Sequence, residues 1–367
     1  MCYSPVGSDA RVTNQIRWLE SAGYQVDVLS RGPEHPDATG RRFQIAYPPL
    51  WLRLAIYAFL PLRARFRRLI ERYLPTAELA GLSFDLILVN DLQLLPWVVE
   101  AAPAMAKGPV VLDLHEVYSG NGTSLFYKVL LARYDDWLLG FIASPVFTAR
   151  LTVAEGIADL YRDQYGVPRP GVIRNVAPYE ELKPSPVDPE RILLEHHGYA
   201  AVERGVDLML AAALELEPRF TLVLMVLGDE AELASIRRHP AVLTGRAELR
   251  PPVPVTDVAR AVNDCDLEVI FFPPRFENNV YALPNKFFES IQGRLGIVIG
   301  QSPEIVPFVR EHGLGVVVDG WTAADLAAAI NRLSADEIAG FKRASDAVAS
   351  ELSTIGEGPR FLAAIGA

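Results

Sequence analysis

The stretch that decides the fold is NNVYALPNKFFE, residues 278–289. Apolar runs over 267–272 and 296–300 flank it, and each run predicts a short buried strand. Pro284 suits the first turn of a helix, because proline lacks an N–H group that would have no partner there. The stretch therefore predicts a polar loop that opens onto a helix at the carboxyl end of a parallel strand.

This strand–loop–helix unit has the features of a phosphate site. A helix N-terminus presents unpaired N–H groups and the positive end of the helix dipole. Lys286 adds a full positive charge, and Glu289 follows one turn later, where a carboxylate can accept hydrogen bonds from a sugar diol. A diphosphate joined to a ribose would satisfy all of these groups, whereas the alternative is an ordinary loop with a solvated lysine.

The same stretch resembles the nucleotide-sugar motif of the GT-B glycosyltransferases of family 4, also called group 1. Many members carry an E-x7-E motif, and one branch reads roughly A-L-P-N-K-F-F-E, as residues 282–289 do. Glu289 matches the second glutamate, but Tyr281 stands where the first is expected. The resemblance implies an α/β chain of two Rossmann-like domains facing a central cleft, with a C-terminal helix that crosses back to the first domain.

Length and composition agree with a chain of two ordinary domains. The chain has 367 residues, half of them hydrophobic, and its net charge of −10 argues against a general nucleic-acid binder. Cys2 and Cys265 lie far apart and outside any ligand-like cluster, which predicts reduced thiols and a cytoplasmic protein. We find no signal peptide and no apolar run of membrane-spanning length.

The first domain, expected over 1–180, opens as a βαβ unit with strands over 2–6 and 24–29 around a helix. Relatives place a glycine of the first loop against the donor phosphates, and Gly7 is the candidate here. Asp9 begins a D-x-R-V sequence that resembles the start of the family's first helix. Alternatively, Gly7 forms a simple turn and Asp9 caps the helix.

Two further expected strands end in polar residues that would point into a ligand crevice. The strand over 84–89 ends at Asn90 and Asp91, and the strand over 110–114 ends at His115 and Glu116. Residues 113–118 resemble the family's D-x-H-E-x-Y sequence, which implies that His115 contacts the transferred sugar. Without the resemblance, a lone histidine would be read as structural. The expected acceptor-side residues are Asp9, Asn90, Asp91 and Glu116.

Residues 51–74 combine aromatic and aliphatic side chains with a strong local excess of positive charge. Pro61 predicts a division into two helices. Glu71 is the only acid among these arginines: Arg53, Arg63, Arg65, Arg67, Arg68 and Arg72. An apolar segment followed by a basic one fits an anionic membrane surface such as the inner face of the cell membrane. The alternative is a packed helix pair with a solvated basic face.

The second domain is expected over 189–342 after a proline-rich linker, with a final helix over about 345–367 returning to the first domain. Residues 191–194 predict its first strand, and residues 195–198 follow as a glycine loop. Gly198 and Arg204 fit a family pattern of a glycine, a spacer and a basic residue that opens a helix. The resemblance implies that Arg204 faces the diphosphate, although a solvated arginine is the alternative. Tyr199 stands where many relatives have a second arginine.

The implied reaction is transfer of a sugar from a nucleoside diphosphate to an acceptor hydroxyl, with retention and without a metal or other cofactor. The residues expected to take part in the chemistry are His115, Arg204 and Lys286. The residues expected to bind the donor are Gly7, Gly198, Arg204, Gly228, Asn279, Tyr281, Leu283, Asn285, Lys286 and Glu289. The acceptor would belong to a surface glycan, a glycolipid or a secondary metabolite.

The departures at Tyr281, Tyr199 and Ala154 leave a second hypothesis open. The chain could be a catalytically inactive GT-B module that binds a nucleotide or a partner glycosyltransferase. A third hypothesis, a sugar-nucleotide 2-epimerase, needs paired acids and histidines that we do not find beyond His115 and Glu116. If Tyr281 redirects the activity, a residue of the loop over 277–279 could contact the sugar in place of the missing glutamate.

Overall fold

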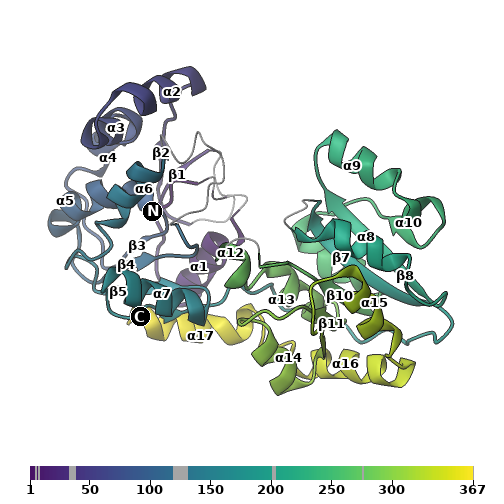
Figure 1. The fold of residues 1–367 in the computed structure, drawn as a ribbon. Coiled ribbons are helices and arrows are strands. Elements are labelled where there is room, and N and C mark those ends of the chain that lie inside the picture. The colour runs from purple at the N-terminus through teal and green to yellow at the C-terminus, as the bar shows by residue number, and fades with distance from the viewer. Residues whose placement is uncertain are drawn as a thin grey trace. The chain divides into compact units, whose positions relative to one another are not determined.

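The computed structural model describes residues 1–4, 6, 9–32, 39–118, 131–200, 204–274 and 277–366. It forms two compact units, one of Met1–Asn175 with Gly358–Ala367 and the other of Val176–Glu357 (Figure 1). These units differ from the sequence-based ranges mainly at residues 176–188 and between 343 and 357, all of which join the second unit.

The second unit is built on one sheet of six parallel strands in the order β12-β11-β10-β7-β8-β9 (Figure 1). The strands are β7 (Ile192–Tyr199), β8 (Phe220–Leu227), β9 (Ala247–Leu249), β10 (Leu267–Ile270), β11 (Gly296–Ile299) and β12 (Gly315–Val317). Successive strands run outward from β7 on one side and from β10 on the other. The strand order therefore reverses between β7 and β10, and in such doubly wound sheets ligands bind at the carboxyl ends of that strand pair.

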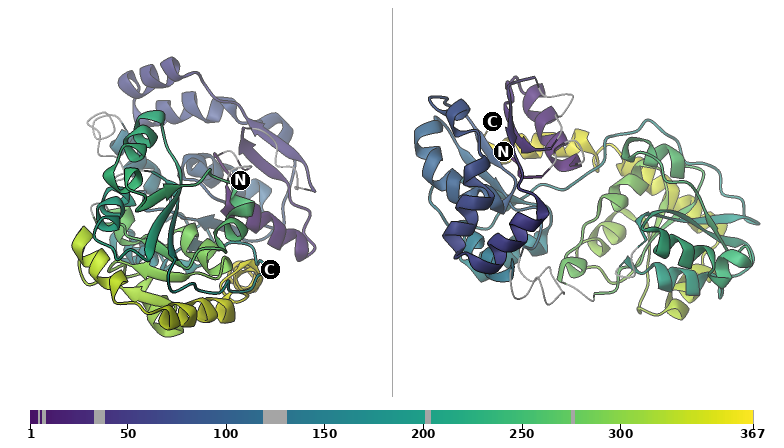
Figure 2. Two further views of the ribbon diagram at one scale, coloured as in Figure 1. Left: turned by 90° about the vertical axis from the view of Figure 1, so that its right-hand side faces the viewer. Right: turned by 90° about the horizontal axis from the view of Figure 1, so that it is seen from above.

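Helices cover both faces of this sheet, and Figure 2 shows them on either side of the strands. They are α8 (Val206–Ala213), α9 (Glu230–Arg237), α10 (Pro240–Leu243), α11 (Val258–Val262), α12 (Glu277–Val280), α13 (Asn285–Gln292), α14 (Val306–His312), α15 (Ala323–Asn331) and α16 (Ala335–Val348). On one face, Met209 and Leu210 of α8 and Leu326 of α15 are buried in the larger core. On the other face, Val258 and Val262 of α11 are buried in a smaller core.

The first unit has a sheet of four parallel strands in the order β3-β4-β5-β6 and a separate pair, β1 and β2. The strands are β1 (Val28–Arg31), β2 (Arg42–Ile45), β3 (Ile87–Val89), β4 (Val110–Asp113), β5 (Ala149–Thr152) and β6 (Gly171–Val172). The helices are α1 (Ala10–Ser21), α2 (Leu50–Phe59), α3 (Leu62–Leu69), α4 (Thr76–Leu79), α5 (Leu95–Met105), α6 (Ala132–Leu139) and α7 (Glu155–Tyr165). The last helix, α17 (Thr354–Ile365), brings Phe361 to 5.3 Å from Trp18 of α1, ring centre to ring centre.

Several expectations for individual elements are confirmed. Pro61 separates α2 from α3. Thr322 and Ser334 form capping boxes with Asp325 and Glu337, as the three-residue spacing of these pairs in the sequence predicts. Other expectations were wrong in their bounds: the strand expected from 24 starts at Val28, and the helix expected after Ser302 begins only at Val306. Within the described residues, we find no helix with the length and apolar character needed to cross a bilayer.

The strand expected over 2–6 is wrong, because none of the described residues 1–4 and 6 lies in a strand. Met1 and Cys2 instead connect the two sheets of the first unit. The Cys2 N–H donates to Leu29 O of β1 at 2.8 Å, and Met1 O accepts from Asn90 N at 2.9 Å, just after β3. The Met1 ammonium donates to Leu88 O at 2.6 Å and is fully buried, which lowers its pKa.

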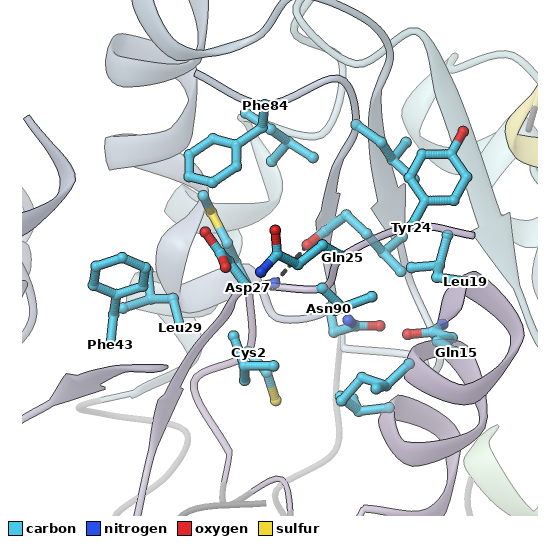
Figure 3. Close-up of a pocket in the computed structure, with 18 of the residues that line it drawn as sticks. Cys2, Gln15, Leu19, Tyr24, Gln25, Asp27, Leu29, Phe43, Phe84 and Asn90 are labelled. Atoms are coloured by element: carbon cyan, nitrogen blue, oxygen red, sulfur yellow. Dashed lines mark hydrogen bonds between the residues drawn. The ribbon is translucent and has the colours of Figure 1, made fainter. Parts of the chain in front are cut away.

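A cavity of about 110 Å³, the N-terminal cavity, lies beside these residues between β1 and β3. Figure 3 shows Leu29, Phe43 and Phe84 among the side chains that line it. The two strands that flank the cavity are not paired with each other. The space is therefore an apolar slot between two strand edges, held together at one end by Met1 and Cys2.

Candidate functional site

The candidate site lies at the carboxyl ends of β7 and β10, where the strand order of the second unit reverses. These two strands are paired in parallel, with Glu268 of β10 beside Glu195 of β7. After β10 the chain passes through α12 and enters α13 at Asn285. Pro284 occupies the N-cap position of α13, one residue earlier than the sequence predicted. Lys286 and Glu289 lie on the first two turns of this helix.

Strand β7 continues through Tyr199, whereas the sequence indicated a loop from Glu195 onward. As a result Glu195, His196 and His197 are buried in the sheet, with no more than 4 % of each residue exposed. The eight-residue ladder between β7 and β8 holds this segment extended. Burial of three consecutive polar residues demands partners for each of them.

His197 joins strand β7 to helix α13 through its two ring nitrogens. Its Nδ1 lies 2.9 Å from Glu195 Oε2 and 3.4 Å from Glu268 Oε2. Its Nε2 lies 2.9 Å from Glu289 Oε2. Ser290 of α13 donates its hydroxyl to Glu268 Oε2 at 3.1 Å. We call Glu195, His197, Glu268 and Glu289 the carboxylate–imidazole cluster.

The charges of this cluster are mutually compensating. Burial opposes a charge on His197, but the carboxylates of Glu195 and Glu268 outweigh it and raise the pKa of the imidazole well above its ordinary value. Burial and the neighbouring Glu195 charge raise the pKa of Glu268, which therefore keeps its proton. Burial also acts against ionisation of Glu195, yet His197 lowers the pKa of that carboxyl. The cluster thus holds an imidazolium beside an ionised Glu195, and its second ring nitrogen bonds to Glu289.

Lys286 is buried at the end of β7. Its ammonium donates to the backbone oxygen of His197 and lies 3.1 Å from His196 Nε2. Burial lowers the pKa of Lys286 to about 8, although the charges of Glu268 and Glu195 favour its protonated form. His196 stays neutral, because burial and the Lys286 charge lower its pKa. Lys286 is therefore mostly protonated at neutral pH and loses its charge as the pH rises through about 8.

Arg204 and Lys286 both approach the ring of Phe272. The Arg204 guanidinium carbon and the Lys286 ammonium each lie 5.1 Å from the ring centre. Each of these contacts is close enough for a cation–π interaction. Phe272 follows β10, so the structure brings the two expected cations to the same end of the sheet.

Gly198 lies next to the side chain of Lys286. It has a φ of +115°, and a Cβ atom there would meet Lys286 Nζ at 3.4 Å. Gly205, the N-cap of α8, is more tightly constrained: its φ is +72°, and a Cβ atom would meet Phe271 O at 2.0 Å. Both positions therefore require glycine, one for its backbone conformation and one also for a close approach to β10.

The remaining expected donor residues surround this region with different roles. The Asn279 amide donates to Pro273 O at 3.2 Å and so fixes the loop after β10. Leu283 is buried, Tyr281 is half-buried, and Asn285 is the first residue of α13. Asn279 also lines a small cavity of about 30 Å³ at the carboxyl ends of β10 and β11. Gly228 follows β8 and lies next to Glu232, which caps α9 together with Asp229.

In the first unit, two of the expected acceptor-side residues, Asp9 and Asp91, have structural partners, whereas the buried Oδ1 of Asn90 has none among the described residues. Asp9 caps α1 by accepting from Val12 N at 3.1 Å, as the alternative interpretation had it. Asp91 accepts from the backbone N–H groups of Tyr3 and Ser4. Asn90 is buried beside the N-terminal cavity. Gly7 lies outside the described residues.

His115 and Glu116 follow β4 in the first unit. Glu116 is exposed, and His115 is half-buried with its ring 6.1 Å from that of Tyr118. The Nδ1 atom of His115 is buried and has no hydrogen-bond partner among the described residues. A buried nitrogen without a partner is uncommon, and a bound ligand is one of the groups that can satisfy it.

The described residues offer one group that could hold a metal ion. Ligand atoms of Glu195, His197 and Glu268 lie within 4.8 Å of one another. Residues 264–266 form a D-x-D tripeptide, a sequence that binds metal in other glycosyltransferases. Here Asp266 instead pairs with Lys342 at 3.1 Å and Asp264 with Arg250 at 2.8 Å. In the group of Glu195, His197 and Glu268, the proton on Glu268 and the imidazolium of His197 already balance the negative charge of Glu195.

Sequence reasoning missed Glu195, His197 and Glu268 as part of the site. Glu268 interrupts the apolar run over 267–272, and Glu195 to His197 extend the run over 192–194. A charged residue inside a buried strand signals a paired group. The sequence contained this signal, but we assigned Glu195 to His197 to a loop.

Comparison with known proteins supports the fold. Residues 7–178 match the family model described as Glycosyltransferase Family 4. HepE of Anabaena, in complex with UDP and glucose, aligns with a TM-score of 0.69 and 14 % identity over 100 % of this chain and 98 % of its own. WaaG, a glycosyltransferase involved in lipopolysaccharide biosynthesis, aligns with a TM-score of 0.69 and 12 % identity over 99 % and 97 % of the two chains.

Sucrose-phosphate synthase of Thermosynechococcus elongatus gives a TM-score of 0.69 and 15 % identity over 98 % of this chain and 93 % of its own. The chain spans only 55 % of TarM of S. aureus, with a TM-score of 0.59. No curated protein matches the chain significantly in sequence. The expected GT-B fold of two Rossmann-like domains is thus confirmed, and so is the resemblance to family 4 glycosyltransferases.

We predict that Gly205→Ala destabilises the chain by more than Gly245→Ala does. Both glycines have a φ of +72°, but a Cβ atom at Gly245 meets nothing within 4 Å. The left-handed backbone costs each variant about 1–2 kcal/mol, and the contact with Phe271 O adds to that cost only at Gly205. Denaturant titration of both variants isolates the contact, and equal losses would contradict this account of the α8 N-terminus.

Proposed function

The chain has the GT-B fold, and its residues 7–178 match the family 4 model; from this premise we propose that it is a glycosyltransferase. It would move a sugar from a nucleoside diphosphate to an acceptor hydroxyl. The observation that carries this proposal is the convergence of Arg204 and Lys286 on Phe272 at the switch point of the second sheet. Two cations at a helix N-terminus form a site for a diphosphate.

The proposed reaction retains the anomeric configuration and uses no metal. Negative charge develops on the diphosphate as the bond to the sugar breaks, and preorganised cations lower the barrier for that charge. Arg204, Lys286 and the N-terminus of α13 would supply this stabilisation. The departing phosphate would take the acceptor proton while an oxocarbenium-like sugar forms, so that no side-chain nucleophile is needed.

Each donor part has a candidate partner. The ribose diol would bind Glu289, and the diphosphate would bind Arg204 and Lys286. The sugar would meet His115, an assignment that rests on the D-x-H-E-x-Y resemblance and on its unpartnered Nδ1. HepE was solved with UDP, which makes UDP the first nucleotide to test.

Tyr281 favours the alternative of an inactive module that binds a nucleotide or a partner glycosyltransferase. It stands in place of the glutamate that relatives use against the donor sugar. The two hypotheses differ in turnover and not in nucleotide binding. Hydrolysis or transfer with a panel of nucleotide sugars separates them, because the inactive module turns over none of the donors.

We also propose that the first unit contacts an anionic membrane, where a lipid-linked or surface-glycan acceptor would be found. Helix α2 exposes large apolar side chains, with Trp51 70 % and Phe59 84 % exposed. Helix α3 carries the exposed arginines Arg63, Arg67 and Arg68. An exposed apolar helix followed by a basic one is typical of interfacial segments.

For the donor site, we predict that UDP raises the melting temperature and that its affinity falls as pH rises through about 8. The Lys286 pKa lies at about 8 in the free protein, so the attracting charge is lost above that pH. Lys286→Met should weaken binding about ten- to a hundredfold at pH 7 and flatten the pH dependence. Thermal shift followed by calorimetry at several pH values measures both effects.

Lys342→Met is the matched control for this variant. Lys342 is also a buried lysine of the second unit, but it pairs with Asp266 and Cys265 O, away from Phe272. It should lose stability and keep the UDP affinity of the wild type. The proposed donor site is contradicted if no nucleoside diphosphate shifts the melting temperature, or if the Lys286→Met and Lys342→Met variants bind UDP with equal affinity.

For the membrane contact, we predict that the chain sediments with phosphatidylserine vesicles and not with neutral ones. Changing Arg63, Arg67 and Arg68 to glutamine should lower the partition coefficient about a hundredfold, since each basic residue near the surface contributes about 1 kcal/mol. A variant with Arg237, Arg238 and Arg310 changed to glutamine carries the same charge change on the second unit. Equal sedimentation of the two variants would exclude the basic helix as the contact.

A further inference from the structure

The carboxylate–imidazole cluster is more elaborate than the stability of the sheet requires. Glu195 and Glu268 are side by side in the middle of a buried sheet, and each has one carboxylate oxygen without a partner among the described residues. Apolar residues of similar volume at such positions are commonly neutral or stabilising. A cluster that is costly to bury is therefore expected to serve another group.

The cluster ends at Glu289. Glu195 and Glu268 are buried to within 1 % of complete coverage, and the His197 side chain is 6 % exposed. The side chain of Glu289 is 12 % exposed, which makes it the most accessible member. His197 bonds to Glu289 Oε2, so Oε1 is the oxygen that remains for a ligand.

We propose that His197 is a positioning residue for the sugar-nucleotide donor: held by Glu195, it fixes the Glu289 carboxylate in the orientation that accepts the ribose diol. This inference rests on the proposed function. A carboxylate on a helix has several rotamers of similar energy, and fixing one of them removes an entropy cost from binding. The charge-assisted bond from an imidazolium is also about twice as strong as a neutral one.

The surroundings keep this positioning bond charged over the neutral pH range. The ionisable groups that face His197 are Glu195 on its own strand, Glu268 on β10, and Lys286 and Glu289 on α13. The carboxylates raise the pKa of His197, whereas burial acts in the opposite direction. Removing the Glu195 charge therefore moves the loss of the imidazolium to lower pH.

The test measures affinity for a nucleoside, which reports on the ribose contact without the diphosphate and hence without the contribution of Lys286 to phosphate binding. The probe is uridine or the nucleoside of whichever diphosphate binds the wild type. His197→Leu should weaken nucleoside binding about ten- to a hundredfold. His197→Gln, whose amide can still donate to Glu289, should recover most of it. Glu195→Gln should move the pH at which nucleoside affinity falls to a lower value.

Lys342→Met is again the control, because it breaks the buried ion pair between α16 and Asp266, the residue before β10, without touching Glu289. Unchanged nucleoside affinity in His197→Leu, or a pH profile in Glu195→Gln that matches the wild type, overturns the inference. If His197→Leu fails to fold, the glutamine variants at 197 and 195 still decide the question. A wild type that binds no nucleotide at all overturns the proposed function and this inference with it.

Discussion

The structure depends most on how the second unit accommodates charge inside a parallel sheet. Glu195 and Glu268 lie next to each other on paired strands, where two ionised carboxylates would repel strongly in a medium of low dielectric constant. One of them keeps its proton, and an imidazolium from His197 neutralises the other. This arrangement fixes the distance between β7 and the first turns of α13, because His197 bonds to both. The position of Lys286 and Glu289 relative to the sheet follows from that constraint.

Two glycines complete the arrangement. Gly198 supplies a backbone conformation that other residues rarely adopt, and Gly205 also allows the start of α8 to approach the backbone of Phe271. With these contacts, the positive end of α13 and the cations Arg204 and Lys286 converge near one aromatic ring. The site is therefore built from the rigid ends of strands and helices. Such a site requires little reorganisation when an anion binds, which favours preorganised electrostatic stabilisation.

The sequence predicted the parts of this unit where local chemistry decides the conformation. The loop before α13, the capping boxes at Thr322 and Ser334, and the strands over 220–227 and 296–299 follow from turn residues, caps and apolar periodicity. It did not predict the length of β7, because Glu195, His196 and His197 have low strand propensity. Pairing with the nearby β8 overrides that propensity, and so do partners on β10 and α13 that lie 70 or more residues away in the chain. The strand expected over 2–6 failed for a related reason. Only Met1 and Cys2 find pairing partners on both sides, at Leu29 and Asn90, so the following residues turn away toward Asp91.

In the first unit, hydrogen-bond partners separate structural polar residues from candidate functional ones. The two sequence motifs that suggested ligand contacts, around Asp9 and around His115, meet through an ion pair: Arg11 Nε lies 2.6 Å from Asp113 Oδ2. Burial raises the cost of the Asp113 charge, but Arg11 outweighs it and lowers the pKa of that carboxyl. Arg11 also donates to Ile173 O at 2.6 Å, which ties α1 to the residue after β6. Most of the polar side chains in these motifs therefore hold the unit together, and their presence in a sequence is no evidence of a ligand. His115 differs, since its buried Nδ1 has no partner among the described residues, and the hydroxyl of Tyr118 and Oδ1 of Asn90 share this property. A buried nitrogen left unpaired costs about 1–3 kcal/mol, a cost that a fold retains where a ligand later supplies the missing bond.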